Sequence, residues 1–167
     1  MAQSIAGHCY LKGLGVKKSR HHAHRWLIEA ATNGNVDAMS NLGLMFEIGD
    51  GIPADRRQAI RWYRTAARAG DTFAQVNLGL MYLGGTGSRP NRVLGVDWLR
   101  KAARKRDPKA LYNLATAYLR GDGVKANPKT AQRYFRKAAE LGDESAIAYL
   151  QGSDSPAQGR GSRKASR

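Results

Sequence analysis

The chain has 167 residues, the length of one domain, and its 28 lysines and arginines against 13 acidic residues give a formal net charge of +15. A single cysteine excludes a disulfide framework within the chain. The sequence contains no signal peptide and no apolar run long enough to span a membrane. We therefore expect a cytoplasmic protein without a transmembrane segment.

The chain divides into four consecutive copies of one 36-residue repeat. An Ala-Ala pair recurs at this interval, at Ala30-Ala31, Ala66-Ala67, Ala102-Ala103 and Ala138-Ala139. Two glycines that form a G-x-G turn recur in the same register, as in Gly49 and Gly51. A repeat of this length cannot bury its apolar face alone, so the copies are expected to stack. We expect repeats at about 1–34, 35–70, 71–106 and 107–142, followed by a capping helix at 143–151.

Each repeat is predicted to hold two helices, because the second, third and fourth copies each contain two residues suited to cap a helix N-terminus and the first copy contains the second of these, Ser19. In the second repeat, Asn35 precedes a first helix over about 36–48, and Asp55 precedes a second helix over about 56–69. The second helix has the spacing of one buried face at Ala59, Trp62, Tyr63, Ala66 and Ala67.

The turn between repeats carries a glycine suited to a left-handed helix end in three copies, at Gly34, Gly70 and Gly142. Arg106 takes this place in the third copy, so we expect a less regular turn there.

The two ends of the chain depart from the repeat. Projecting the interval backwards places the first helix cap before residue 1, so whether the natural start lies upstream stays open. A signal segment there would change the expected localisation. Residues 152–167 lack apolar periodicity and hold one aspartate against four basic residues. We predict a disordered basic tail over this range.

These motifs resemble the Sel-1-like repeat family. The family pattern is present in the second repeat as Ala38…Leu42-Gly43…Phe46, then Gly49-Asp50-Gly51-Ile52, then Ala59…Trp62-Tyr63…Ala66-Ala67 and Gly70. The resemblance implies an all-α fold, a right-handed α/α solenoid of about four and a half helix-pair repeats, with first helices on the concave side and second helices on the convex side. It also implies an adaptor or scaffold for other proteins, of the kind found in bacterial signalling, secretion or envelope complexes, without naming a partner.

The first-helix segments are nearly neutral and partly apolar, which indicates a groove for a segment of a partner protein. We expect five side chains to contact that segment: Val76, Leu80, Leu83, Tyr112 and Thr116. The alternative is that these side chains pack between neighbouring first helices.

Nearly all the positive charge lies on the second-helix segments. Together these segments, 19–33, 55–69, 91–106 and 127–141, carry a formal charge of +13, whereas the four first-helix segments carry −1. The expected electrostatic surface comprises Arg61, Arg64, Arg100, Arg104, Arg133 and Arg136. Two interpretations stay open: a solvated face whose alkyl stems cover the alanine-rich core, or a face that binds an acidic protein, nucleic acid or an anionic membrane surface. Nucleic acid is the weaker partner, because no recognition motif is present.

No catalytic motif, complete phosphate-binding loop or cofactor motif is present, so we expect neither an enzyme nor a cofactor. His21 and His24 lie three residues apart without an adjacent carboxylate or thiol, so no metal site is expected. The main hypothesis is an interaction adaptor that binds a partner segment in the concave groove. The alternative is electrostatic binding of nucleic acid or an acidic protein through the second-helix face and the tail.

Overall fold

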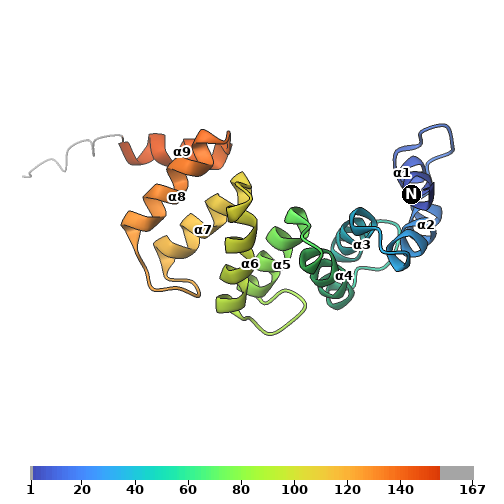
Figure 1. The fold of residues 1–167 in the computed structure, drawn as a ribbon, viewed down its shortest axis with the longest axis horizontal. Coiled ribbons are helices and arrows are strands. Elements are labelled where there is room, and N and C mark those ends of the chain that lie inside the picture. Colours follow the sequence, from blue (N-terminus) through green and yellow to red (C-terminus); the bar gives the residue numbers. More distant parts are fainter. Residues whose placement is uncertain (1, 155–167) are drawn as a thin grey trace, which may run out of the picture.

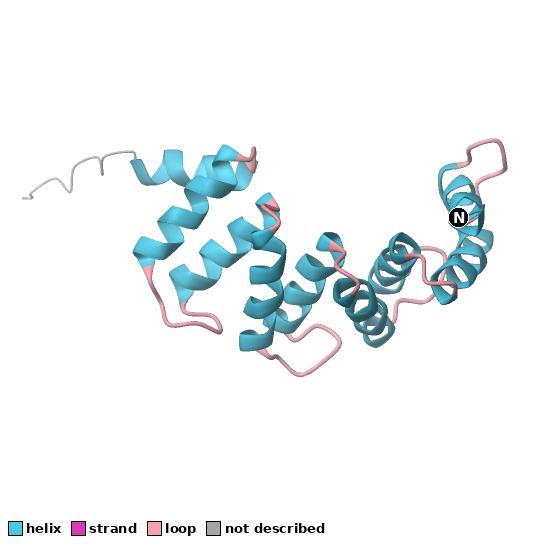
Figure 2. Cartoon of the chain, viewed as in Figure 1, coloured by secondary structure: helices cyan, strands magenta, loops and turns pink. Residues whose placement is uncertain are grey.

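The described chain is a curved row of antiparallel helix pairs followed by a single last helix (Figure 1). The structure is a computed structural model that describes residues 2–154. Within that range helices are joined by loops and no strand occurs (Figure 2). The helices are α1 (Ala2–Lys12), α2 (Arg20–Thr32), α3 (Val36–Ile48), α4 (Arg56–Arg68), α5 (Thr72–Gly84), α6 (Arg92–Arg104), α7 (Pro108–Arg120), α8 (Pro128–Glu140) and α9 (Glu144–Asp154).

The helices begin where the capping residues predict. The side chains of Asn35, Asp71, Asp107 and Asp143 each accept a hydrogen bond from the backbone N–H three residues later, at 2.6–2.8 Å. Ser19, Asp55, Asn91 and Asn127 cap the second helices in the same way. The predicted helix over 36–48 is confirmed, and the one predicted over 56–69 ends at Arg68 with Ala69 as its C-cap.

The last helix is longer than its predicted end at residue 151, since α9 continues to Asp154. Gly152 does not adopt a positive φ, so it continues the helix instead of ending it. The first three residues of the predicted tail therefore belong to α9. Residues 155–167 lie outside the described range, where the prediction of a disordered tail stays a prediction.

The core is a row of fully buried side chains at one position of every second helix. Leu27, Tyr63 and Leu99 are inaccessible to solvent and Phe135 is 2 % exposed. The neighbouring tryptophan column is less completely buried, because Trp26 and Trp62 are only half-buried. The 27/63/99/135 column is therefore the more completely enclosed of the two.

Each member of this column faces a small residue on the first helix of its own repeat. A Cβ placed on Gly43 would lie 2.5 Å from the Tyr63 ring, and one on Gly79 would lie 2.9 Å from the Leu99 side chain. Contacts this short are incompatible with any larger residue unless the helices move apart. The large side chain on the second helix and the small residue on the first helix of the same repeat are thus complementary in size.

From the second repeat onward, the second glycine of each G-x-G turn lies against the preceding repeat. Gly123 has a φ of +71°, and a Cβ there would lie 2.2 Å from the carbonyl oxygen of Arg92, in the first turn of α6. Glycine is needed both for the left-handed backbone and for this close approach. The turn is therefore an inter-repeat contact as well as a change of chain direction.

Polar side chains also connect neighbouring repeats. The guanidinium of Arg64 donates to the hydroxyl of Tyr82 at 2.7 Å, and that of Arg100 donates to the hydroxyl of Tyr118 at 3.1 Å. An ion pair joins Arg92 to Asp122 at 3.4 Å. Each of these bonds links a second helix to the first helix, or following turn, of the next repeat.

Candidate functional site

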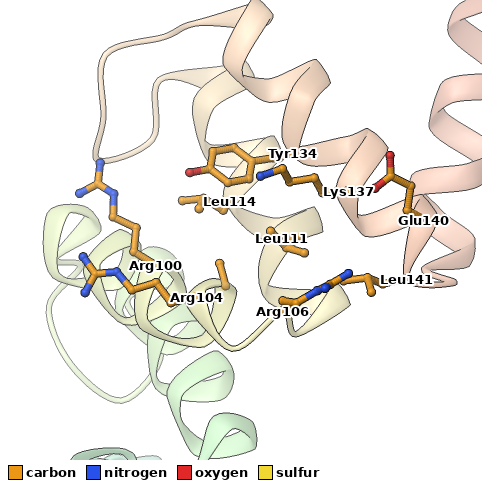
Figure 3. Close-up of a pocket in the computed structure, with 10 residues that line it drawn as sticks. Arg100, Arg104, Arg106, Leu111, Leu114, Tyr134, Lys137, Glu140 and Leu141 are labelled. Atoms are coloured by element: carbon orange, nitrogen blue, oxygen red, sulfur yellow. The ribbon is translucent and has the colours of Figure 1, made fainter.

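A cleft of about 610 Å³ lies between the second helices of the last two repeats. One wall is α6 and the other is α8, with α7 between them (Figure 3). We call it the basic cleft and define it by the residues that line it: Arg100, Ala103, Arg104, Arg106, Leu111, Leu114, Tyr134, Lys137, Glu140 and Leu141.

The floor of the basic cleft is apolar. It is made by Leu111 and Leu114 of α7, which are 4 % and 0 % exposed and lie between the two walls in Figure 3. Tyr134 adds an aromatic ring to the α8 wall and stacks on Tyr118, with ring centroids 5.7 Å apart. Leu111 and Leu114 are themselves covered, so the apolar surface open to a ligand comes from the half-buried Ala103, Tyr134 and Leu141.

The rim of the basic cleft is positively charged. Arg100 and Arg104 come from α6, Arg106 from the following turn and Lys137 from α8, against one acidic side chain, Glu140. The hydrogen bond to the Tyr118 hydroxyl raises the pKa of Arg100 and fixes the guanidinium at this end of the cleft. The summed charge favours an acidic ligand.

Arg106 occupies an unusual backbone conformation. It is the one non-glycine residue with positive φ in the described chain, at +62°, where the equivalent Gly34, Gly70 and Gly142 have φ of +85°, +97° and +84°. The turn predicted to be irregular therefore keeps the left-handed geometry of the others. Its closing hydrogen bond, from the Asp107 N–H to the Ala102 carbonyl, lengthens to 3.4 Å, compared with 3.0 Å in the other three turns.

The conformation of Arg106 is unfavourable for an L-residue by about 1–2 kcal/mol. A basic residue near a helix C-terminus gains only about 0.3–1 kcal/mol from the helix dipole, and Lys101 and Arg104 already provide that charge in the last turn of α6. Arg106 also lies next to the N-terminus of α7, where a positive charge is disfavoured. Local stability thus does not account for an arginine here.

The structure separates the six arginines of the predicted electrostatic surface. Arg100 and Arg104 line the basic cleft, whereas Arg133 and Arg136 line a shallower depression of about 440 Å³ on α8. Arg61 and Arg64 lie on α4, outside both. Arg64 and Arg100 also bond tyrosines of the next repeat, so their role is partly structural.

Sequence reasoning did not select Arg106, Tyr134, Lys137 or Glu140 for this site. The signal for Arg106 was present, because it interrupts a column of glycines. Lys137 gave no such signal, since its place in the cleft depends on how α8 packs against α6 and α7.

The five residues predicted to line a groove are placed differently from one another. Val76 is 6 % exposed and packs with Leu99, Ala102 and Ala110, so it belongs to the core where we expected a groove position. Leu80 is 39 % exposed and is available to a partner.

The other three groove residues are half-buried. Leu83 packs against buried residues of α6 and α7, and Tyr112 packs edge-to-face on Phe135 at 5.5 Å. Thr116 donates its hydroxyl hydrogen to the carbonyl of Tyr112.

The histidines of the first repeat do not form a metal site with other ligands. Within residues 2–154, no three His, Cys, Asp or Glu side chains gather as metal ligands. His24 instead packs edge-to-face on Phe46. Burial, and secondarily the charge of His21, lowers its pKa from the ordinary histidine value of 6.5. The same range of the chain holds no helix with the length and hydropathy of a membrane span.

The comparisons with known proteins agree on the repeat family. A family model described as Sel1 repeat matches residues 1–35, 36–71, 72–107 and 108–143. A search of curated proteins gave no match. Twenty-eight solved chains match in structure.

Two of these structures share 36 % sequence identity with the chain. The first is c5321 of uropathogenic Escherichia coli, a protective antigen with an SLR fold, with a TM-score of 0.86 over 89 % of this chain. The second is a Sel1 repeat protein of Oxalobacter formigenes, with a TM-score of 0.84 over 90 % of this chain. The match spans only 32 % and 62 % of their respective lengths.

A third structure, Helicobacter pylori cysteine rich protein B, has a TM-score of 0.58 over 76 % of this chain and 96 % of its own, at 23 % identity, and supports the fold alone. The predicted all-α repeat solenoid is confirmed by these neighbours and by the helices themselves. With four consecutive family matches over residues 1–143, the chain belongs to the Sel1 repeat family.

Proposed function

We propose that this chain is a protein-interaction module that binds an acidic segment of a partner protein in the basic cleft. Sel1 repeat proteins generally mediate protein–protein interaction, and their scaffold families are typically non-enzymatic. The observation that carries the proposal is the pairing of a rim with four cationic side chains and an apolar floor in one concavity.

The apolar floor favours a protein over a nucleic acid. A partner helix or extended segment can place aliphatic side chains against Ala103, Tyr134 and Leu141 while its carboxylates meet the rim. A single-stranded nucleic acid would need several exposed aromatic rings for stacking. Trp98 is 8 % exposed and lies under the Lys101 ammonium, 3.9 Å from the ring centroid, and Tyr134 of the cleft is already stacked on Tyr118.

The first-helix face is a second candidate for the docking site. Leu80 and Phe73 of α5 and Leu119 of α7 are 39 %, 46 % and 37 % exposed. These apolar side chains favour a neutral or apolar partner segment. This is the groove predicted from the sequence, and Leu80 is the most exposed of the five residues predicted to line it.

Matched substitutions distinguish the two candidate docking sites in a binding experiment. The probe is a fluorescent amphipathic peptide with a leucine face flanked by glutamates, and its control has glutamines in place of the glutamates. Lys137→Glu is expected to weaken binding about tenfold, the effect of about 1.4 kcal/mol. Arg61→Glu makes the same charge change on α4, outside the cleft, and is expected to change the affinity far less.

Leu80→Glu tests the first-helix face and is expected to leave peptide affinity unchanged. If Leu80→Glu abolishes binding and Lys137→Glu does not, the first-helix face is the site. Equal losses from Lys137→Glu and Arg61→Glu would show non-specific attraction to the whole basic face. Tighter binding of single-stranded DNA or RNA than of the glutamate peptide would replace the protein partner with a nucleic acid.

A further inference from the structure

The strongest unexplained feature of the molecule is the left-handed arginine at the end of the basic cleft. Arg106 stands where the three equivalent turns have glycine, and its φ of +62° is unfavourable for any residue with a Cβ. Asparagine or aspartate would adopt this conformation more readily. The choice of arginine therefore calls for a role outside the turn.

The position of Arg106 supplies that role. Its side chain lines the cleft beside Leu111 and extends toward Leu141 at the end of the α8 wall (Figure 3). Arg106 is exposed, and none of the ion pairs within residues 2–152 involves its guanidinium. The neighbouring Lys105 turns away and donates to the Gly70 carbonyl at 2.5 Å, so only Arg106 of this pair serves the cleft.

We propose that Arg106 is the specificity-determining residue of the basic cleft and binds an oxyanion of the partner segment. This inference rests on the function proposed above. A guanidinium offers two parallel N–H groups to a carboxylate or a phosphoryl group, which a lysine does not. Lys137 on the opposite wall adds a second positive charge to the same cavity.

The proposal predicts opposite effects of one substitution on stability and binding. Arg106→Gly restores the residue of the other three turns, so the Tm is expected to rise by roughly 2–8 °C. The same variant removes the oxyanion partner, so its affinity for the glutamate peptide is expected to fall about tenfold. A residue kept only for the turn would not link a gain in Tm to a loss of affinity.

Two further variants distinguish three properties of Arg106: its paired N–H donors, its positive charge and its strained backbone. Arg106→Lys keeps the left-handed strain and the charge but loses the paired donors, so its affinity is expected to lie between those of the wild type and Arg106→Gly. Gly34→Arg places the same residue in the same turn of the first repeat, where a Cβ meets nothing within 4 Å. It is expected to lower the Tm without changing peptide affinity.

The measurements are differential scanning fluorimetry and fluorescence anisotropy with the full chain. Peptides that carry glutamate, phosphoserine or glutamine at the central position distinguish a carboxylate from a phosphoryl ligand. If the wild type binds the glutamate or phosphoserine peptide and Arg106→Gly binds it equally tightly, the role of Arg106 is refuted while the proposed function stands. If the wild type binds neither acidic peptide better than the glutamine peptide, the proposed function fails as well. A lower Tm for Arg106→Gly would show a structural role and overturn the inference.

Discussion

Substituting the second glycine of a G-x-G turn by alanine tests how the repeats hold together. In Gly123→Ala the new Cβ would lie 2.2 Å from the Arg92 carbonyl oxygen and 2.4 Å from the carbonyl carbon. Both are backbone atoms, so a side-chain rotation cannot relieve the clash. The left-handed φ adds about 1–2 kcal/mol and the overpacking about 1–3 kcal/mol, which gives a total loss of about 2–5 kcal/mol.

The chain provides two matched controls for this substitution. Gly15 occupies the same position in the first repeat with a φ of +70°, but a Cβ there would meet nothing within 4 Å in the described chain. Gly142 has a φ of +84° and equally open surroundings. Gly15→Ala and Gly142→Ala are therefore expected to lose only the backbone contribution of about 1–2 kcal/mol.

Urea and thermal unfolding followed by circular dichroism measure the difference. Gly123→Ala is expected to melt roughly 2–12 °C below the two controls, the shift that corresponds to about 1–3 kcal/mol in a chain of this size. Hydrogen exchange would place the loss at the boundary between α6 and the turn after α7. Equal destabilisation of all three variants would refute the idea that this turn is a contact between repeats.

Three further predictions follow from the core, the inter-repeat bonds and the buried histidine. Leu99→Ala is expected to cost about 2–5 kcal/mol in urea unfolding, because Leu99 is fully buried; a loss below 1 kcal/mol would contradict its central position. Tyr118→Phe removes the acceptor of the Arg100 hydrogen bond and is expected to cost about 0.5–1.5 kcal/mol, whereas Asp50→Asn breaks a partly exposed ion pair with Arg20 and is expected to cost less than about 1 kcal/mol. The His24 pKa is lower in the folded state, so the unfolded chain binds more protons below pH 6.5 and stability is lost as the pH falls through that value. The Tm should therefore drop between pH 7 and pH 5, and His24→Phe should flatten this dependence; an unchanged slope in the variant would assign the effect to other groups.

The sequence predicted the helices well because their signals are local. Asn35 and Asp55 are capping residues that act within one turn of their own helix, and the structure places both as N-caps. The buried face of α4 follows from the spacing of residues within a single helix, and Ala59, Tyr63 and Ala66 are indeed inaccessible. Such features need no knowledge of the neighbouring repeat.

The site was harder to predict because it depends on contacts between repeats. Val76 looked like a groove residue from its register in α5, but α6 and α7 cover it. Arg64 looked like a surface charge, but it donates to Tyr82 in the next repeat. Arg106 predicted a less regular turn, because it replaces a glycine. The turn nevertheless keeps its left-handed geometry, and the Arg106 side chain lines a cleft.

The fit between Gly43 and Tyr63 has a consequence for how such chains can be rearranged. The small residues at this position of the first helices are Gly7, Gly43, Gly79 and Ala115, while their partners vary among leucine, tyrosine and phenylalanine. A chimera that joined α7, with its Ala115, to α4, with its Tyr63, would force a methyl group into the space that the tyrosine ring occupies. Recombination or engineering can therefore exchange whole helix pairs cut at the short turns between repeats, whereas a cut inside the G-x-G loop separates two surfaces that have adapted to each other.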